Sequence, residues 1–312
     1  MSKLERLPGW AKRLDEMSGH FTEAGLNGLL DYHAVTSPLG ELLARGEVTP
    51  AQIKEFLDGL RKPVASTAAL AAGASVQSIW DAEVQTFWTR AWAEILGDKL
   101  MQDRKIVVPP LPNMKAKMKI AITGSFGWWI PIFLPANLTE ADYPAEFVKP
   151  DWGKYLKESD IQRRPLLGRW VMVETISKPN WDDPNGYGNG DDPLANVLEL
   201  TNRRFNVSWN RIHETHLPET AKLLGLSKKA VRLPTAEEWN LIGNLFLWLN
   251  RHRNTTLPDI GSTNSWEWCE NAYGDVVRLV VGNRGDGGLG DVVDRWRDGA
   301  CDDVGFRVLA VL

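Results

Sequence analysis

Residues 231–239 read Val-Arg-Leu-Pro-Thr-Ala-Glu-Glu-Trp, and this stretch predicts a strand that turns directly into a helix. Thr235 stands where its side chain can cap the first helical turn. Glu238, three residues later, can reach back to the backbone of Thr235, as in a capping box. We therefore expect a helix from Thr235 to Trp248, with Trp239 packing it against a sheet.

The C-terminal segment, from Gly261 to Leu312, has apolar ends and a glycine-rich middle. Residues 265–268 (Ser-Trp-Glu-Trp) and 304–309 (Val-Gly-Phe-Arg-Val-Leu) are typical of strands. Residues 282–291 hold so many glycines that a regular element is excluded, because each glycine loses more backbone entropy on ordering and has no side chain to pack. Loops framed by apolar strands are the usual design of a recognition site.

The tail from Val276 to Leu312 contains no Lys, Glu, Gln or Met, yet it is rich in Arg and Asp. A short, loop-rich segment that lacks helix-favouring residues is one explanation. The other explanation depends on a family resemblance.

Residues 232–239 resemble the helix-start motif of the formylglycine-generating-enzyme (sulfatase-modifying factor) superfamily, residues 266–268 its W-E-W segment, and residues 305–307 its terminal G-F-R.

These motifs follow one another in the order found in that superfamily, and the resemblance covers about residues 115–312. It implies an α+β, C-type lectin-like domain whose terminal strands pair near the start of the domain. We accordingly expect a helical N-terminal region at 1–105 and the lectin-like domain at 106–312.

Enzymes of the superfamily carry a reactive cysteine pair after a strand that resembles residues 278–283, where this chain has no cysteine until Cys301. The related sulfoxide synthases use a histidine-rich iron site, and His20 and His33 are too isolated to form one. An oxidoreductase of either type with an atypical site is the alternative function. Cys269 and Cys301 are expected to be free thiols, although one local disulfide stays open.

The chain also resembles the variable proteins of diversity-generating retroelements, which end in the same W-E-W and G-F-R motifs. In these proteins adenine-directed mutagenesis acts on AAC or AAT codons of the template. The resulting codons carry any base at the first two positions and a pyrimidine at the third. Such codons never encode Lys, Glu, Gln, Met or Trp, which matches the tail and marks Trp296 as a fixed position. We expect a non-enzymatic protein that binds a protein or glycan ligand through a variable region at about 264–307.

The expected ligand-binding residues are polar or aromatic loop residues, any one of which could instead be an ordinary solvated side chain. They are Asn283, Arg284, Asp286, Asp291, Asp294, Arg295, Trp296, Arg297, Asp298, Cys301 and Asp302. Trp296 is the expected aromatic anchor. The expected scaffold residues are Trp266, Glu267, Trp268, Arg278, Gly305, Phe306 and Arg307. Glu267 and Arg307 should satisfy one another or backbone groups, because buried charges need partners.

No cofactor is expected, with calcium left open because lectin-like folds often bind it. Loop oxygens at Asp182, Asp183, Asn185, Asp191 and Asp192 could hold calcium, although a solvated turn is the preferred interpretation. His213 and His216 lack the spacing and third ligand of a zinc protease site, so a surface helix or loop is expected there.

The net charge of −4 argues against a nucleic-acid partner. The sequence shows no signal peptide and no apolar run long enough to span a membrane. The expected location is cytoplasmic by default, or the surface of a cell or virus particle by a route not visible in the sequence.

Hydrophobic periodicity and turn residues place the remaining elements. We expect helices after Thr49-Pro50, from Val76 to Leu96 with its end at Gly97, and from Pro218 to Leu224. Strands are expected at 119–122, at 128–134 and at 167–175, and a surface loop at 180–193. Pro131 in the second of these strands fits an edge strand or a strand end. The helix before Gly97 should bury one apolar face, made of Ile79, Trp80, Val84, Phe87, Trp88, Ala91, Trp92 and Ile95.

Overall fold

The structure is a computed structural model that describes residues 76–112, 129–152, 164–177, 180–182, 194–195, 198 and 204–312, with side chains from residue 82 on. The helix expected after Thr49-Pro50, the strand at 119–122 and most of the 180–193 loop lie outside the described residues. Contacts divide the chain into two compact units, one of which comprises Trp88–Met118 and Trp128–Leu312. That unit holds all the strands described below.

The first described helix, α6, spans Val76–Asp103 and is interrupted at Gly97, where φ is 76°. The first helical segment therefore ends at Gly97 as predicted, and a second, short helical segment follows it up to Asp103. Trp88, Ala91, Trp92 and Ile95 are buried as predicted, whereas Phe87 is 37% exposed. The indole N–H groups of Trp88 and Trp92 donate to the carbonyls of Pro131 and Phe133, at 2.9 and 3.0 Å. These bonds fix the second half of α6 to the first strand.

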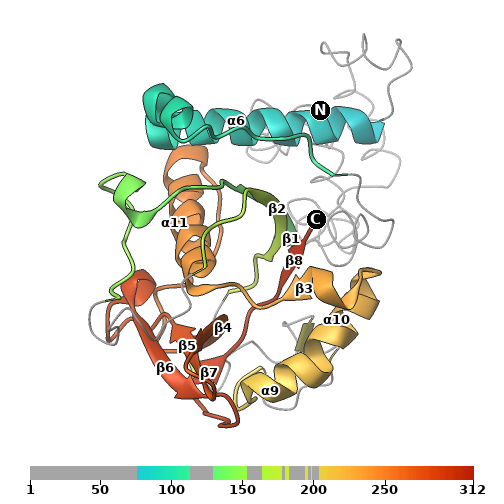
Figure 1. The fold of residues 1–312 in the computed structure, drawn as a ribbon, viewed down its shortest axis with the longest axis vertical. Coiled ribbons are helices and arrows are strands. Elements are labelled where there is room, and N and C mark those ends of the chain that lie inside the picture. The colour runs from blue at the N-terminus through green and yellow to red at the C-terminus, as the bar shows by residue number, and fades with distance from the viewer. Residues whose placement is uncertain are drawn as a thin grey trace, which may run out of the picture. The chain divides into compact units, whose positions relative to one another are not determined.

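The first sheet has the order β1-β2-β8-β3 and is antiparallel throughout. Its strands are β1 (Trp129–Leu134), β2 (Arg169–Glu174), β8 (Leu309–Val311) and β3 (Val231–Arg232). Pro131 lies on the edge strand β1, which confirms its predicted position, since proline cannot donate a ladder hydrogen bond. The C-terminal strand β8 pairs with β2, so the end of the chain returns to the early part of the domain as the resemblance implies (Figure 1).

The second sheet has the order β6-β5-β4-β7. Its strands are β4 (Trp266–Tyr273), β5 (Val277–Val281), β6 (Val292–Trp296) and β7 (Val304–Gly305). β7 runs parallel to β4, whereas the other two pairings are antiparallel, with a register shift in β4 between Trp268 and Ala272. Its strands and the loops between them hold residues 266–305 of the predicted variable region.

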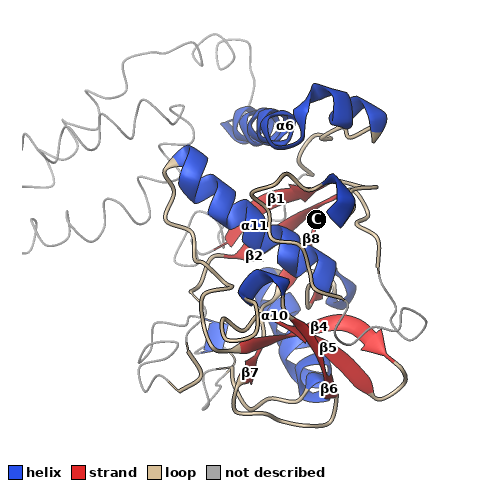
Figure 2. Cartoon of the chain, turned by 90° about the vertical axis from the view of Figure 1, so that its left-hand side faces the viewer, coloured by secondary structure: helices blue, strands red, loops and turns tan. Residues whose placement is uncertain are grey.

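Helix α11 (Ala236–Arg253) follows β3 and begins with the predicted capping box, in which Thr235 accepts from the Glu238 N–H. Trp239 is fully buried and its indole donates to Glu267 of β4, so the helix packs against the second sheet as expected. Figure 2 shows α11 in the middle of the unit. The segment before β3 holds α9 (Trp209–Arg211), a π-helical turn (Ile212–His216) and α10 (Leu217–Leu224). Single 3₁₀ turns lie at Glu140–Asp142, Lys228–Ala230 and Gly288–Gly290.

The described architecture is α+β: helices pack beside two curled, mostly antiparallel sheets (Figures 1 and 2). It is consistent with the C-type lectin-like fold that the resemblance implies. Within the described part of the chain, no helix combines the length and apolarity needed to cross a membrane.

Candidate ligand-binding face

A buried ion pair joins the W-E-W and G-F-R motifs. β4 and β7 place Glu267 beside Gly305. Arg307 reaches the Glu267 carboxylate through Nη2–Oε1 at 3.3 Å and Nε–Oε2 at 3.4 Å. The second terminal nitrogen of Arg307 donates to the carbonyls of Glu174 and Ile176, at 3.0 and 3.1 Å. The expectation that Glu267 and Arg307 satisfy one another and the backbone is confirmed, and the motifs form a rigid frame.

A second buried ion pair, which the sequence did not reveal, lies next to the first. Arg204 Nη1 contacts Glu174 Oε2 at 2.7 Å, and both side chains are almost fully buried. Arg204 also donates to the Phe306 carbonyl, and Glu174 Oε1 accepts from the Val308 N–H at 2.6 Å. Arg204 is 102 residues from Phe306 in sequence, so no local pattern could have indicated the contact.

The loop at 282–291 is organised by Asn283. Its carbonyl accepts the backbone N–H groups of residues 286, 287 and 288, and its Oδ1 accepts that of Gly285 at 2.9 Å. Its Nδ2 donates to the Asn264 carbonyl at 3.2 Å. Asn283, expected to contact ligand, therefore uses its side chain and its carbonyl to hold the loop.

Asp291 closes the same loop and is only 4% exposed. Its N–H donates to the Gly288 carbonyl, and its own carbonyl accepts from the Gly282 N–H at 3.1 Å. In this conformation Asp291 lies inside the loop. Arg284 and Asp286, by contrast, are exposed, so this loop offers those two charged side chains to a ligand.

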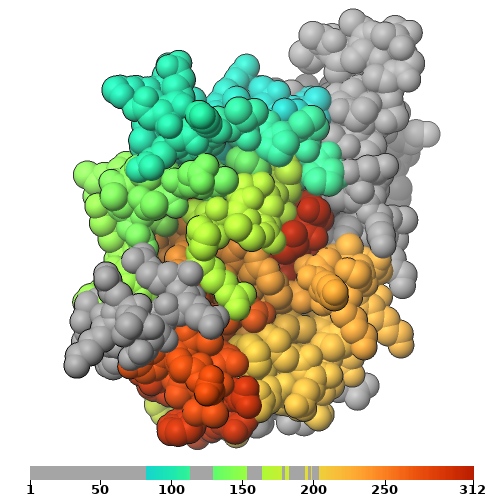
Figure 3. Space-filling model, viewed as in Figure 1, coloured from blue at the N-terminus to red at the C-terminus, as the bar shows by residue number. Residues whose placement is uncertain are grey.

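The other end of β6 carries Trp296, which is 67% exposed. The turn after it is held by a segment outside the tail: the Asn210 N–H donates to the Arg297 carbonyl at 3.3 Å, and the Asn210 amide donates to the Asp298 carboxylate. The Asn206 N–H donates to the Cys301 carbonyl at 3.1 Å. Figure 3 shows the tail, in orange to red, on the surface beside this yellow segment.

Asp294 and Arg295, on β6, are half-buried. The Arg295 guanidinium lies 5.7 Å from the centroid of the Trp266 ring, and its Nη1 donates to the Asp294 carbonyl at 2.9 Å. Of the eleven residues predicted to bind ligand, the exposed ones are Arg284, Asp286, Trp296, Asp298 and Asp302. They lie at both ends of β6, which at about 3.4 Å per residue are roughly 14 Å apart. That any of them binds a ligand stays a prediction.

The histidine pair lies in the π-helical turn after α9. His213 stacks on Trp209 with ring centroids 3.5 Å apart, and its Nε2 contacts Glu270 Oε1 at 3.0 Å. Arg278 covers Trp209 at 4.5 Å, consistent with its expected scaffold role. His216 is 4% exposed and stacks on Phe306, so its expected surface position was wrong. Burial lowers the pKa of His216, and the nearby Arg211 lowers it further.

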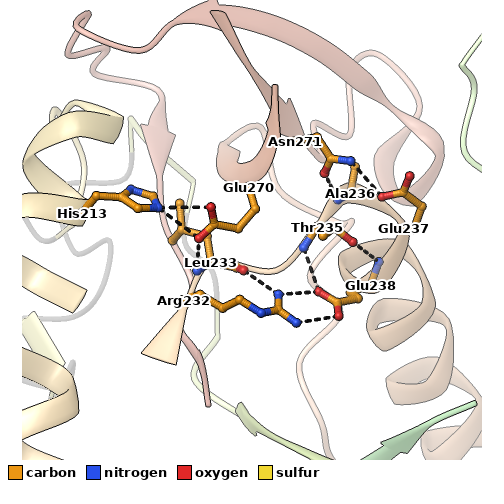
Figure 4. A network of polar contacts seen from close by, with 9 residues as sticks. All are labelled: His213, Arg232, Leu233, Thr235, Ala236, Glu237, Glu238, Glu270 and Asn271. Atoms are coloured by element: carbon orange, nitrogen blue, oxygen red, sulfur yellow. Dashed lines mark hydrogen bonds and ion pairs between the residues drawn. The ribbon is translucent and has the colours of Figure 1, made fainter. Parts of the chain in front are cut away.

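Carboxylates at the start of α11 join this region to the helix (Figure 4). Arg232 binds both oxygens of Glu238, at 2.6 and 2.7 Å, while Glu238 completes the capping box. Glu237 accepts from the Asn271 amide at 3.0 Å, and burial raises its pKa above the ordinary value. Glu270 accepts from the Leu233 N–H as well as contacting His213. All of these carboxylates have structural partners.

Both cysteines are free, as expected. Cys269 is fully buried, and burial raises the pKa of its thiol well above the ordinary value. Cys301 is half-buried, and its pKa is also raised, first by burial and then by the Asp303 charge. A raised pKa leaves less thiolate at neutral pH, so neither thiol is activated as a nucleophile.

Of the residues considered for calcium, the structure describes Asp182 alone, and its Oδ1 accepts from the Asn264 amide at 2.9 Å. Asp183, Asn185, Asp191 and Asp192 lie outside the described residues. Across the described residues, no three His, Cys, Asp or Glu side chains gather as metal ligands would.

No protein-family model matches the sequence, and no curated protein matches it either. Among solved structures, the chain is similar to Treponema denticola variable protein 1, with 12% sequence identity and a TM-score of 0.30. The match covers 50% of this chain and 90% of that protein.

Proposed function

We propose that this chain is a non-enzymatic ligand- or receptor-binding protein whose C-terminal face is diversified by a retroelement. The observation that carries the proposal is a division within the C-terminal segment from Gly261 to Leu312. Its motif residues form a buried frame, with Glu267 and Phe306 at 0% and Arg307 at 3% exposure. The charged loop residues between the motifs, such as Arg284 and Asp298, are exposed.

This division suits diversification because the frame makes its hydrogen bonds without the exposed loop side chains. Arg307 is satisfied by Glu267 and by the backbone carbonyls of Glu174, at the end of β2, and of Ile176, just beyond it. Changes at Arg284 or Asp286 leave all of these bonds in place. Mutated Asn codons also account for the missing Lys, Glu, Gln and Met between Val276 and Leu312.

The two thiols do not support the alternative that the chain is an oxidoreductase. Cys269 is buried beside Glu267 and Glu270, whose charges add to burial in raising its pKa. Thiol chemistry needs an accessible thiolate, usually one stabilised by a neighbouring cation. The two cysteines therefore act as small side chains of the fold, and a double Cys269→Ser, Cys301→Ser variant should bind as the native chain does.

The decisive experiment is to sequence the DNA that flanks this gene. We expect a near-copy of the segment encoding the tail, which differs mainly where the copy has adenine, beside a reverse-transcriptase gene. Each mismatch would then identify one diversified position. If neither feature is present, diversification is wrong and the composition of the tail is a chance feature of a loop-rich segment.

A protein-level experiment tests the division directly. Both libraries use codons with any base at the first two positions and a pyrimidine at the third. The first library carries them at the exposed loop positions Arg284, Asp286, Asp298 and Asp302. The matched library carries them at the loop-holding and frame positions Asn283, Asp291, Glu267 and Arg307. We expect most members of the first library, and few of the second, to fold as judged by surface display and protease resistance. Equal survival of both libraries would contradict the proposed roles of frame and loops.

A further inference from the structure

An exposed tryptophan outside the tail lies beside the first tail loop. Trp181 is 46% exposed. Its backbone N–H donates to Asn264 Oδ1 at 3.1 Å, and the Asn264 amide donates to Asp182 at 2.9 Å. The Asn264 N–H donates to Asn180 Oδ1 at 3.0 Å, while its carbonyl accepts from Asn283 Nδ2 at 3.2 Å. Asn264 thus joins the backbone of Trp181 to the residue that organises the 282–291 loop.

The adjacent residue extends the contact to an exposed tail position. The Arg284 N–H donates to the Thr263 carbonyl at 2.7 Å. Residues 263–264 therefore lie between the 180–182 segment and the start of the loop. The backbone of Trp181 is therefore one segment away from that of the exposed Arg284. None of these hydrogen bonds uses the Trp181 indole, and the residue is 46% exposed.

Tryptophan is enriched among the residues that dominate protein interfaces, because it buries a large area with few rotatable bonds. If the tail is diversified as proposed, its mutated codons cannot encode Trp. A diversified face of this kind needs its tryptophans from constant positions. Trp181 meets that need at the loop end of β6, as Trp296 does at the other end.

We infer that Trp181 is an invariant contact residue of the binding face, an inference that rests on the proposed function. It presents the same indole to a protein partner whatever the loop sequence is. A polypeptide surface is the partner that fits the dimensions. The exposed charges lie on the loops that precede and follow β6, and the strand itself is about 14 Å long, so one ligand that touches both loops must be extended. Interfaces between folded proteins, at about 800 Å² per partner, cover such a distance.

The test uses the full chain as a displayed library, diversified at Arg284, Asp286, Asp298 and Asp302, selected in parallel on immobilised lysozyme and on mannan. Independent lysozyme binders then receive Trp181→Ala, Trp181→Phe or the control Leu167→Ala. Leu167 is 61% exposed and lies just before β2 of the first sheet, whereas the diversified loops belong to the second sheet. We expect Trp181→Ala to weaken most binders about tenfold or more, Trp181→Phe to weaken them less, and Leu167→Ala to change Kd less than about twofold.

Thermal unfolding of Trp181→Ala should match that of the parent binder, because the backbone hydrogen bond to Asn264 remains. Lysozyme binders that are indifferent to Trp181→Ala would overturn the inference and leave the proposed function intact. Binders obtained on mannan alone would overturn the assignment of a polypeptide partner. A library that yields no binder on either probe would overturn the proposed function and this inference together.

Discussion

Arg307 and Glu267 form an ion pair with Nη2–Oε1 at 3.3 Å, and their side chains are 3% and 0% exposed. The pair connects the terminal G-F-R motif to strand β4. The second terminal nitrogen of Arg307 donates to the carbonyls of Glu174, the last residue of β2, and of Ile176. One guanidinium therefore ties both sheets together. The loops of the tail connect strands of the sheet that this ion pair holds in place.

Replacing Arg307 by Ala should strongly lower the free energy of unfolding. The substitution leaves Glu267 buried without its cation, and breaking a buried pair in this way costs about 3–5 kcal/mol. Urea denaturation measures the loss. Arg251→Ala is the control, since Arg251 and Glu146 form an exposed pair at 3.5 Å and such pairs contribute about 0–1 kcal/mol. Equal losses in both variants would contradict a framing role for Arg307.

Replacing Thr235 by Ala should destabilise the start of α11. The Thr235 hydroxyl accepts from the Glu238 N–H at 3.2 Å, and loss of such a cap costs about 1 kcal/mol. Thr235→Ser keeps the hydroxyl and should retain most of the stability. The midpoint of urea unfolding distinguishes the two variants. If Ser and Ala behave alike, the capping hydrogen bond contributes nothing.

Stability should fall as the pH is lowered below about 6.5, the ordinary pKa of histidine, partly because of His216. Burial lowers the pKa of His216 in the folded chain, and Nδ1 has no hydrogen-bond partner in the described structure. The unfolded chain binds the proton at a higher pH than the folded chain does, so stability is full above the unfolded pKa and is lost as the pH falls toward the folded pKa. His216→Gln should flatten the fall between pH 7.5 and pH 5.5.

The control for that prediction is His252→Gln, since the His252 side chain is 45% exposed. Urea unfolding of the native chain and both variants at several pH values separates the effects. The native slope should persist in His252→Gln and decrease in His216→Gln. If all three proteins show the same slope, His216 does not contribute to the pH dependence.

The two thiols should differ in reactivity toward a disulfide reagent. Half-buried Cys301 should react slowly in the native chain and faster as the pH rises, because its pKa is raised. Buried Cys269 should react after unfolding in urea. Cys301→Ser should therefore abolish the native reaction, as absorbance of the released thiol reports. Rapid labelling of native Cys301→Ser would show that Cys269 is accessible and would reopen thiol chemistry.

Gly288→Ala should disturb the 282–291 loop. Gly288 has φ of 62°, and a Cβ placed there would lie 2.8 Å from the Gly261 carbonyl oxygen. Gly274 has nearly the same φ, 61°, but a Cβ there meets nothing within 4 Å. Both alanines carry the backbone strain of a positive φ, at about 1–2 kcal/mol. Thermal unfolding should show the larger loss for Gly288→Ala, and equal losses would mean that the close approach to Gly261 is easily relieved.

Local interactions made much of this fold predictable. The capping box at Thr235 and Glu238 and the strand that begins at Trp266 depend on residue types within a few positions of one another. The end of the first helical segment of α6 at Gly97 was predictable for the same reason, because glycine readily leaves the helical region of φ and ψ. The single strand expected at 304–309 was wrong, because this segment forms two short strands, β7 and β8, that belong to different sheets. The expected surface position of His216 failed because its ring packs on Phe306, ninety residues away.

The sequence alone determined the motifs, their order and the unusual composition of the tail, because these are properties of neighbouring residues and of codons. The tertiary structure decided which polar residues are used by the fold and which face solvent. Asn283 holds a loop, Arg204 pairs with Glu174, and Trp181 lies beside the tail through Asn264. Each of these roles depends on chain segments that come together only when both sheets and α11 have packed, and hydrogen bonds between distant segments leave no local pattern to read.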